Sequence, residues 1–334
     1  MNLMTIIIAL IVFGVIVTVH EMGHFFTAKY FGVTVHQISV GMGPKLYSKT
    51  KKETEYSLRA LPLGGYVRME GEDSESQDPN SFNNKHPLKR MAIIFAGPFM
   101  NFILTIVLMS FLFMMIGVPG NKIGSRVENM PASNSGLEVG DKIIMIDDKK
   151  IDSWQSVTDA IQSSPDNNLE FTIERNNEQK IIAVDAVEQA GRKVVGISPA
   201  SEKSPGKSLV FGTNQTILML TDMLSFLGKL FTGQAGDEGV VGPVGIISAV
   251  GEAARTGFAN VISLAAIISL NLGLINLLPI PALDGSRIVF QAIELLRGKK
   301  IDPEKEGFVH MIGMILLLAL MLFITSKDIL RIFG

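Results

Sequence analysis

The chain contains no cysteine among its 334 residues. Disulfide bonds are therefore excluded, as is any metal site built on thiolates, so a metal ion must be held by His, Asp or Glu. Charged side chains are also scarce, at 19% of the residues, whereas 47% are hydrophobic and the mean hydropathy is +0.33. This composition is typical of a membrane protein. The formal net charge of −2 gives no reason to expect nucleic-acid binding.

Long apolar runs are the most prominent feature that is present. Four stretches, at residues 3–31, 91–118, 261–283 and 308–324, are near the roughly 20 residues that a membrane-spanning helix needs. No Lys or Arg precedes the first run and no small-residue cleavage site follows it, so we interpret it as a span rather than a signal peptide. The sequence thus predicts a polytopic α-helical membrane protein with four transmembrane helices.

Residues 119–205 differ from the rest of the chain because they are polar and mixed in charge. Apolar and polar residues alternate over 169–174, which predicts a half-buried strand. Apolar residues recur at helical spacing over 154–161, after a capping Asp152 or Ser153. We therefore expect one small α+β domain inserted between the second and third spans.

The segment 206–232 is amphipathic, with an apolar stripe that comprises Ile217, Leu220, Leu224, Leu227 and Phe231. We interpret it as a helix in the membrane interface rather than a fifth span, and we hypothesise that it gates substrate entry. The expected domains are residues 1–118 with two spans and the loop between them, the inserted domain 119–205, the interfacial segment 206–257, and residues 258–334 with the last two spans.

Basic residues set the expected orientation. The loop between the first two spans and the loop after the third span are both rich in Lys and Arg. Because short cytoplasmic loops are enriched in these residues, both loops should be cytoplasmic. The inserted domain then lies outside the cytoplasm, as do both termini.

The sequence His20-Glu21-Met22-Gly23-His24 lies inside the first apolar run. Ionisable groups are costly in hydrocarbon, so chains keep them there mainly for function. On a helix, His20 and His24 lie on one face, where both can bind a single zinc ion, and Glu21 is placed to activate a water molecule. The alternative is that the two histidines form hydrogen bonds between helices.

A catalytic zinc usually takes three protein ligands, so a third residue is needed at the depth of the histidines. His20 lies roughly 25 Å into a hydrocarbon core about 30 Å thick, on the cytoplasmic side. The second span returns the chain outside and the third re-enters, so the same depth is reached by Asp284, the first acidic residue after a long uncharged stretch. Pro279 and Pro281 should break the helix just before it and give water a path to the metal. Alternatively, Asp284 is a helix cap or an interfacial carboxylate beside Arg287.

These residues occur in motifs that resemble those of the site-2 protease family of intramembrane zinc metalloproteases. The motifs are HEMGH in the first span, AGPFMNF at 96–102, NLLPIPALDG at 276–285, PLGGYV at 62–67 and VGPVGI at 241–246. The last two resemble the bacterial branch, which carries an external PDZ domain and regulates envelope stress. The resemblance implies that His20, His24 and Asp284 bind Zn²⁺ and that Glu21 is the catalytic base.

The resemblance also implies a substrate, partners and a location. The substrate would be a single-pass membrane protein cut within its membrane segment, either an anti-sigma factor already trimmed by an upstream site-1 protease or a remnant signal peptide. The enzyme would lie in the bacterial inner membrane, with the PDZ domain outside and the active site near the cytoplasmic side.

Residues 135–143 resemble the core signature of PDZ domains. Such domains bind peptides by β-augmentation, although this one can also be read as a steric plug. Some bacterial relatives have two tandem PDZ domains, whereas residues 119–205 leave room for about one. This departure puts in doubt any size filter that depends on two domains.

Four residues are candidates for substrate binding: Gly64, Gly65, Tyr66 and Asn276. Gly64 and Gly65, followed by Tyr66, resemble the turn of a hairpin whose edge strand holds an unwound substrate; the alternative is an ordinary cytoplasmic hairpin. Asn101 and Asn276 are polar residues at membrane depth that either donate to the oxyanion of the cleaved bond or join helices. We favour Asn276 for the oxyanion because it lies two turns before the Asp284 carboxylate.

Two other classes of function compete with a protease. A membrane adaptor would use its PDZ domain to capture partners and zinc for structure only, but a closed structural site needs four ligands. A metal transporter would need further ionisable residues along the second and fourth spans, which have almost none besides His310. The sequence therefore favours an intramembrane zinc endopeptidase, and Glu21→Gln distinguishes it from the adaptor.

Overall fold

The computed structural model describes residues 3–72, 76–189, 191–234 and 242–333. The chain forms two compact units, the first comprising Met1–Met109 with Gly212–Gly334 and the second comprising Ser110–Phe211. Each unit is described by itself below. The first residue of the VGPVGI motif, Val241, lies outside the described residues.

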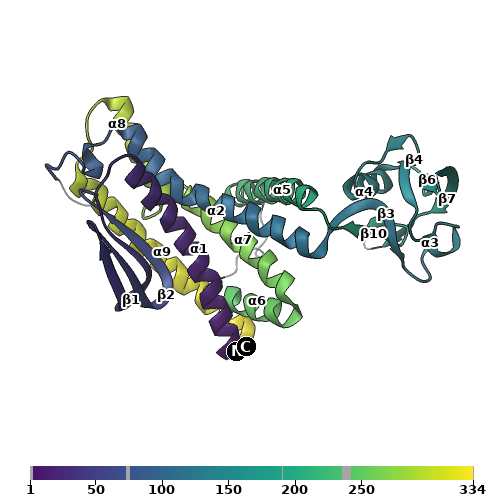
Figure 1. Ribbon diagram of the computed structural model, residues 1–334, viewed down its shortest axis with the longest axis horizontal. Helices are drawn as coiled ribbons and strands as arrows, with labels where there is room; N and C mark the ends of the chain where they lie inside the picture. The colour runs from purple at the N-terminus through teal and green to yellow at the C-terminus, as the bar shows by residue number, and fades with distance from the viewer. Residues whose placement is uncertain (1–2, 73–75, 190, 235–241, 334) are drawn as a thin grey trace. The chain divides into compact units, whose positions relative to one another are not determined.

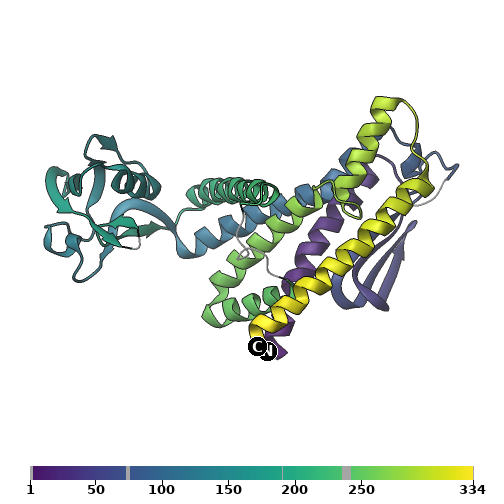
Figure 2. The same cartoon turned by 180° about the vertical axis from the view of Figure 1, so that it is seen from behind.

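The first unit is mainly helical (Figure 1). Its helices are α1 (Leu3–Tyr30), most of α2 (Pro87–Ile116), most of α5 (Pro205–Phe231), α6 (Pro243–Thr256), α7 (Phe258–Asn276), α8 (Asp284–Arg297) and α9 (Pro303–Phe333), with a short 3₁₀ helix at Phe82–Asn84. Its strands are β1 (Val35–Lys51) and β2 (Thr54–Met69). Helix α1 contacts β2, α6 and α7, and α6 also contacts α9 (Figure 2).

Four helices in the described part of the chain are long and apolar enough to cross a membrane: Leu3–Tyr30, Pro87–Ile116, Phe258–Asn276 and Glu304–Asp328. The prediction of four spanning helices is therefore confirmed, and α5 is not among them. The third span ends at Asn276 rather than at residue 283. A proline has no backbone N–H and disfavours a helical residue before it, so Pro279 and Pro281 keep the apolar residues 277–283 out of a helix.

The two strands form a long, curled hairpin whose turn lies at Lys52 and Glu53. The prediction that Gly64–Gly65 forms the turn is wrong, because both glycines lie inside β2. The central residues of β1 are paired on both sides, so that Val40 is opposite Leu58 and also opposite Gly65. In the described residues no third strand joins this sheet, and the Gly65 segment of β2 therefore has an outer edge without a strand.

A buried cluster joins the hairpin to α1 and to the first turns of α2. It comprises Phe25, Ala28, Val33, Val35, Ile38, Met69, Phe82, Ile93 and Ile94. Full burial of one large apolar side chain contributes about 1.5–3 kcal/mol, so the cluster fixes the hairpin beside the C-terminal half of α1.

The second unit is the inserted, sheet-rich part of the chain. Its elements are β3 (Val118–Arg126), α3 (Pro131–Asn134), β4 (Lys142–Ile146), β5 (Lys149–Lys150), α4 (Trp154–Ser163), β6 (Asn168–Arg175), β7 (Glu178–Asp185), β8 (Val187–Gln189), β9 (Arg192–Val194) and β10 (Ile197–Glu202). The main sheet has the order β10-β3-β4-β6-β7, with β5 paired to β4, and β8 pairs with β9.

Both local predictions for this unit are confirmed. The alternation over 169–174 belongs to β6, in which Leu169, Phe171 and Ile173 are fully buried in the core of the unit. The helical spacing belongs to α4, whose N-cap is Ser153; the Ser153 Oγ accepts a hydrogen bond from the Ser156 backbone N–H at 3.2 Å.

A buried ion pair closes one end of this sheet. The Arg175 guanidinium donates to both oxygens of Asp141 at 2.7 Å, and the Glu138 backbone N–H donates to Asp141 Oδ2 at 2.8 Å. Burial raises the pKa of the Asp141 carboxyl, but the hydrogen bonds from Arg175 and Glu138 outweigh that effect, so the pKa lies below its usual value.

Candidate zinc site

Two histidines near the C-terminal end of α1 present their Nε2 atoms to the same point. One helical turn separates His20 from His24, so both side chains leave the same face of the helix. Both are buried, and their Nε2 atoms lie 3.2 Å apart. Two nitrogens of this kind on one face can bind a single metal ion.

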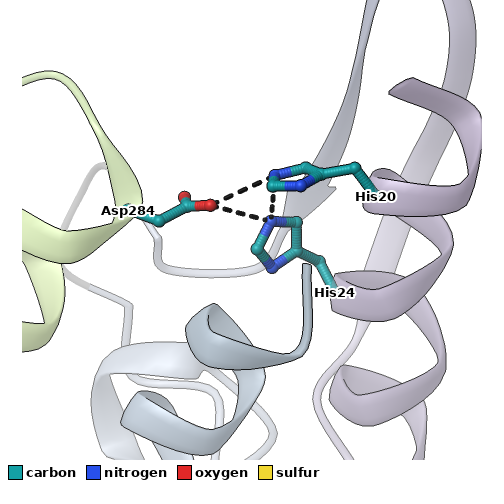
Figure 3. Close-up of side chains that lie close together, drawn as sticks. All are labelled: His20, His24 and Asp284. Carbon is teal, nitrogen blue, oxygen red and sulfur yellow. Dashed lines mark hydrogen bonds and ion pairs between the residues drawn. The ribbon is translucent and has the colours of Figure 1, made fainter. Parts of the chain in front are cut away.

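The carboxylate of Asp284 completes the cluster. Asp284 is the first residue of α8, and its Oδ2 lies 3.1 Å from His20 Nε2 and 3.4 Å from His24 Nε2. Figure 3 shows the two imidazoles extending from one helix and the carboxylate reaching them from another. These distances place Asp284 beside the two histidines, where the count of spans led us to expect it.

The spacing of these atoms fits zinc. Bonds of about 2.0–2.1 Å in tetrahedral geometry place neighbouring ligand atoms about 3.3–3.4 Å apart, close to the observed 3.1–3.4 Å. Among the described residues, His20, His24 and Asp284 are the group of His and acidic residues that can hold a metal ion. Three ligands leave a fourth tetrahedral position for water or substrate.

Helix α2 orients both imidazoles from behind. His24 Nδ1 lies 2.9 Å from the Ile93 carbonyl oxygen, and His20 Nδ1 lies 3.2 Å from the Asn101 side-chain amide. Because a carbonyl oxygen only accepts hydrogen bonds, the Nδ1 of His24 carries the ring proton and its Nε2 presents a lone pair to the cluster.

Close packing of α1 on α2 makes this possible. A Cβ added to Gly23 would overlap the Ala96 carbonyl and lie 2.9 Å from the Gly97 Cα. A Cβ added to Gly97 would overlap the His24 ring and lie 2.9 Å from His20 Nε2. Glycine at both positions therefore lets the two backbones approach closely beside the imidazoles, with Gly97 next to both Nε2 atoms.

The side chain of Glu21 lies beside the hairpin. A Cβ added to Gly65 would lie 3.0 Å from Glu21 Cγ and 2.8 Å from the Ser39 carbonyl oxygen. The predicted general base thus follows His20 directly in α1 and lies beside the Gly65 segment of β2.

The structure separates the four substrate-binding candidates. Gly64, Gly65 and Tyr66 are consecutive in β2, where Gly65 lies beside Glu21, and the Tyr66 hydroxyl accepts a hydrogen bond from Arg59 Nη2 at 2.6 Å. Asn276 is the half-buried last residue of α7, and its side chain makes no hydrogen bond to another described residue.

Helix α9 supports the loop that carries Asp284. Ala282 has a φ of +77°, which is rare for a residue with a side chain, and its backbone N–H donates to His310 Nδ1 at 3.0 Å. This contact, and the contacts of Gly97 and Asn101 with the imidazoles, were not predicted from the sequence. AGPFMNF places Gly97 and Asn101 one turn apart on one face of α2, but the sequence does not show which face of α2 is turned toward His20.

Comparison with known proteins decides the family. The model of peptidase family M50 matches residues 8–320. The chain belongs to peptidase family M50. This M50 protein is an intramembrane zinc metalloprotease of the site-2 protease type, and Zn²⁺ is its cofactor.

Relatives of this M50 protein cover nearly its whole length. A candidate zinc metalloprotease of Clostridium acetobutylicum is 38% identical over 335 residues, which cover 98% of each chain. Zinc metalloprotease RasP of Oceanobacillus iheyensis is 33% identical over 421 residues, with 98% of this chain and 99% of the relative covered. The regulator of sigma-W protease RasP of Bacillus subtilis is 32% identical over 418 residues, with the same coverage. Both RasP alignments are longer than the 334 residues of this chain, so these relatives carry a long stretch that has no counterpart here.

Proposed function

We propose that the enzyme cuts the membrane-spanning segments of single-pass membrane proteins, with His20, His24 and Asp284 as the zinc ligands and Glu21 as the catalytic base. One observation carries the proposal: three ligand atoms from α1 and α8 converge at 3.1–3.4 Å, and α1 is long and apolar enough to span a membrane. A polar cluster of this kind is energetically costly at membrane depth, so chains keep one there mainly for function.

The chemistry follows from the arrangement of the side chains. When bound, zinc supplies Lewis acidity that activates water and polarises the scissile carbonyl. Glu21 accepts a proton from the attacking water and delivers it to the departing amine. The position of Glu21 beside β2 supports this role, because a peptide lying along β2 would pass close to its side chain.

Strand β2 would hold the substrate extended. A transmembrane helix hides its peptide bonds, so it must unwind before cleavage, and a strand edge offers backbone N–H and C=O groups that replace the lost helical hydrogen bonds. The outer edge of the Gly65 segment supports this proposal, as does the absence of a side chain on Gly64 and Gly65 that would keep a peptide away from Glu21. Tyr66 lies in the same segment, and Asn276 remains the proposed oxyanion donor.

The substrate class is proposed from the relatives. The Bacillus subtilis relative is named as a regulator of sigma-W protease, which favours an anti-sigma factor as substrate, first trimmed by an upstream site-1 protease. Remnant signal peptides are the second substrate class proposed from the family resemblance.

The location and the domain roles are proposed from charge and pattern. The Lys- and Arg-rich loops support a bacterial inner-membrane protein whose zinc site lies near the cytoplasmic side and whose inserted unit is extracytoplasmic. The resemblance of residues 135–143 to a PDZ signature, within a unit built on a six-stranded sheet, supports a peptide-binding or size-limiting PDZ domain. Exposed apolar side chains on α5, among them Ile217 and Leu224, support its interfacial position.

The test is cleavage of a single-pass anti-sigma factor co-expressed with the enzyme. Glu21→Gln should keep zinc and lose cleavage, whereas His24→Ala should lose both. A Glu21→Gln variant that still cleaves at the wild-type rate would contradict the assigned base. The adaptor alternative predicts instead that Glu21→Gln changes nothing and that removal of residues 119–205 abolishes partner capture.

A further inference from the structure

The side chain of Asn101 is completely buried where α2 meets α1 and α7. Its amide lies 3.2 Å from His20 Nδ1, on the side of the ring opposite to the zinc cluster. Its backbone carbonyl accepts hydrogen bonds from the hydroxyls of Thr105 and Ser269, each at 2.9 Å. Asn101, Thr105 and Ser269 are all fully buried, so the amide has one fixed position behind the His20 ring.

We infer that Asn101 is a positioning residue that accepts a hydrogen bond from His20 Nδ1–H through its Oδ1, and so directs the Nε2 lone pair of His20 toward zinc. The inference rests on the proposed function, in which His20 is a ligand. It concerns the orientation of that ligand and goes beyond the ligand set itself.

The position of the proton on the His20 ring follows from the chemistry of imidazole. A nitrogen that binds a metal must present its lone pair, so in a neutral ring the proton lies on the other nitrogen. His20 Nε2 faces Asp284 Oδ2 and His24 Nε2, and the proton therefore lies on Nδ1. A buried Nδ1–H needs an acceptor, and the Asn101 amide is the group within hydrogen-bond distance among the described residues.

The orientation of the Asn101 amide follows from its hydrogen-bond donors and acceptor. If its NH₂ faced Nδ1–H, two donors would meet and the buried Oδ1 would have no hydrogen-bond partner among the described residues. A half-turn about the last side-chain bond exchanges the oxygen and the nitrogen, and it places Oδ1 against the ring proton. Hydrogen-bonding chemistry therefore selects Oδ1 as the atom that faces His20.

The second histidine follows the same rule. His24 Nδ1 donates to the Ile93 carbonyl, an acceptor that admits no other assignment. Helix α2 thus supplies one acceptor behind each ligand, Ile93 through its backbone and Asn101 through its side chain. Acceptors behind metal-binding histidines fix ring orientation and raise ligand basicity, and their loss typically weakens metal binding about 10–100-fold.

The burial of Asn101 also excludes direct contact between its amide and the substrate. With none of its surface exposed, the amide does not reach a peptide carbonyl, so an oxyanion role is not available to it. Its action on the reaction is through His20.

The experiment measures zinc affinity of the purified full chain by competition with a chelator. Asn101→Leu removes the acceptor and should weaken zinc binding about 10–100-fold. Asn101→Asp keeps an oxygen acceptor and has no donor, so it should bind zinc within a few-fold of wild type. If Asn101→Asp loses zinc as Asn101→Leu does, or if Asn101→Leu keeps wild-type affinity, the inference is overturned.

Two controls separate folding and ligation from orientation. Thr105→Val removes a hydroxyl from the same helix contact without touching His20 and should keep wild-type zinc affinity; equal loss in Thr105→Val and Asn101→Leu would mean that Asn101 only joins helices. His20→Ala should lose zinc. If it retains zinc, the proposed ligand set fails, whereas loss in His20→Ala with full retention in Asn101→Leu overturns only the role of Asn101.

Discussion

Gly65 of β2 lies directly against the side chain of Glu21, although 44 residues separate them in the sequence numbering. A Cβ at Gly65 would be 3.0 Å from Glu21 Cγ, tighter than ordinary van der Waals contact. The hairpin is therefore part of the surroundings of the proposed base.

Gly65→Ala should impair cleavage and leave zinc in place. The added methyl group would press on Glu21 and on the Ser39 carbonyl, and overpacking of about 1–3 kcal/mol corresponds to a roughly 5–150-fold lower rate. The measurement is cleavage of a single-pass substrate together with zinc content. Gly307→Ala is the matched control, because a Cβ there meets nothing within 4 Å. Undiminished cleavage by Gly65→Ala would show that β2 does not crowd the base.

Gly97→Ala should weaken zinc binding. Its methyl group would occupy space now filled by the His24 ring and would displace the imidazole from the cluster. We expect a loss of about 10–100-fold in zinc affinity, measured by chelator competition. Gly307→Ala serves as the control, since it lies on α9 with nothing near its Cβ. Wild-type affinity in Gly97→Ala would mean that α2 can move away without disturbing the ligands.

His310→Leu should also weaken zinc retention, although His310 is not a proposed ligand. Its loss leaves the Ala282 backbone N–H without its acceptor, at a cost of about 1–3 kcal/mol, and releases a loop whose backbone is already in a rare conformation. Asp284 would then lose its fixed position. Zinc content after dialysis against a chelator is the readout, and Met311→Leu, at an exposed neighbouring position, is the control. Equal zinc retention in both variants would show that packing alone, and not the hydrogen bond to His310, maintains the loop geometry.

The stability of the inserted unit should depend on acidic pH through Asp141. Its pKa is lower in the folded chain than in the unfolded chain, so the pair with Arg175 stabilises the fold above the unfolded value of about 3.9. That contribution should be lost as the pH falls through the folded pKa. Trp154, the single tryptophan of the chain, packs against the core of this unit and reports its unfolding by fluorescence.

In urea titrations of the detergent-solubilised chain, the wild-type midpoint should fall below about pH 4. Asp141→Asn should be about 1–3 kcal/mol less stable at pH 7 and should lose most of this acid dependence. Asp148→Asn, at an exposed position, should behave as wild type. An unchanged acid dependence in Asp141→Asn would assign the titration to other groups.

The position of Asp284 beside His20 could be predicted from the sequence because it depends only on the number of membrane spans. Each span reverses the side on which the chain emerges, so counting spans places the end of the third beside His20 whatever the rotation of the helices. The rotation itself was not predictable. Lipid is as apolar as the protein interior, so apolar residues on α1 and α2 do not show which face is buried. The contacts of Gly97 and Asn101 with the imidazoles depend on that rotation and became visible only in the structure.

Local chemistry misled the interpretation of Gly64–Gly65. Two consecutive glycines favour a tight turn, but the register of this hairpin is set by a turn at Lys52 and by the pairing of β1 on both sides. Gly65 instead allows close approach to α1, and Gly64 allows close approach to Met42 of β1. In the inserted unit, by contrast, period-two burial in β6 and the Ser153 cap of α4 were readable because one side of each element faces water.

The third proposed ligand, the carboxylate of Asp284, lies on α8, whereas both imidazoles lie on α1. A chain that is still being synthesised therefore has only two of the three proposed ligands until α8 has been made and has folded against the histidines. Metal capture then joins the earliest helix to one of the latest, and a chain truncated before α8 should be recovered without zinc. Unfinished chains in the bilayer should therefore have no proteolytic activity.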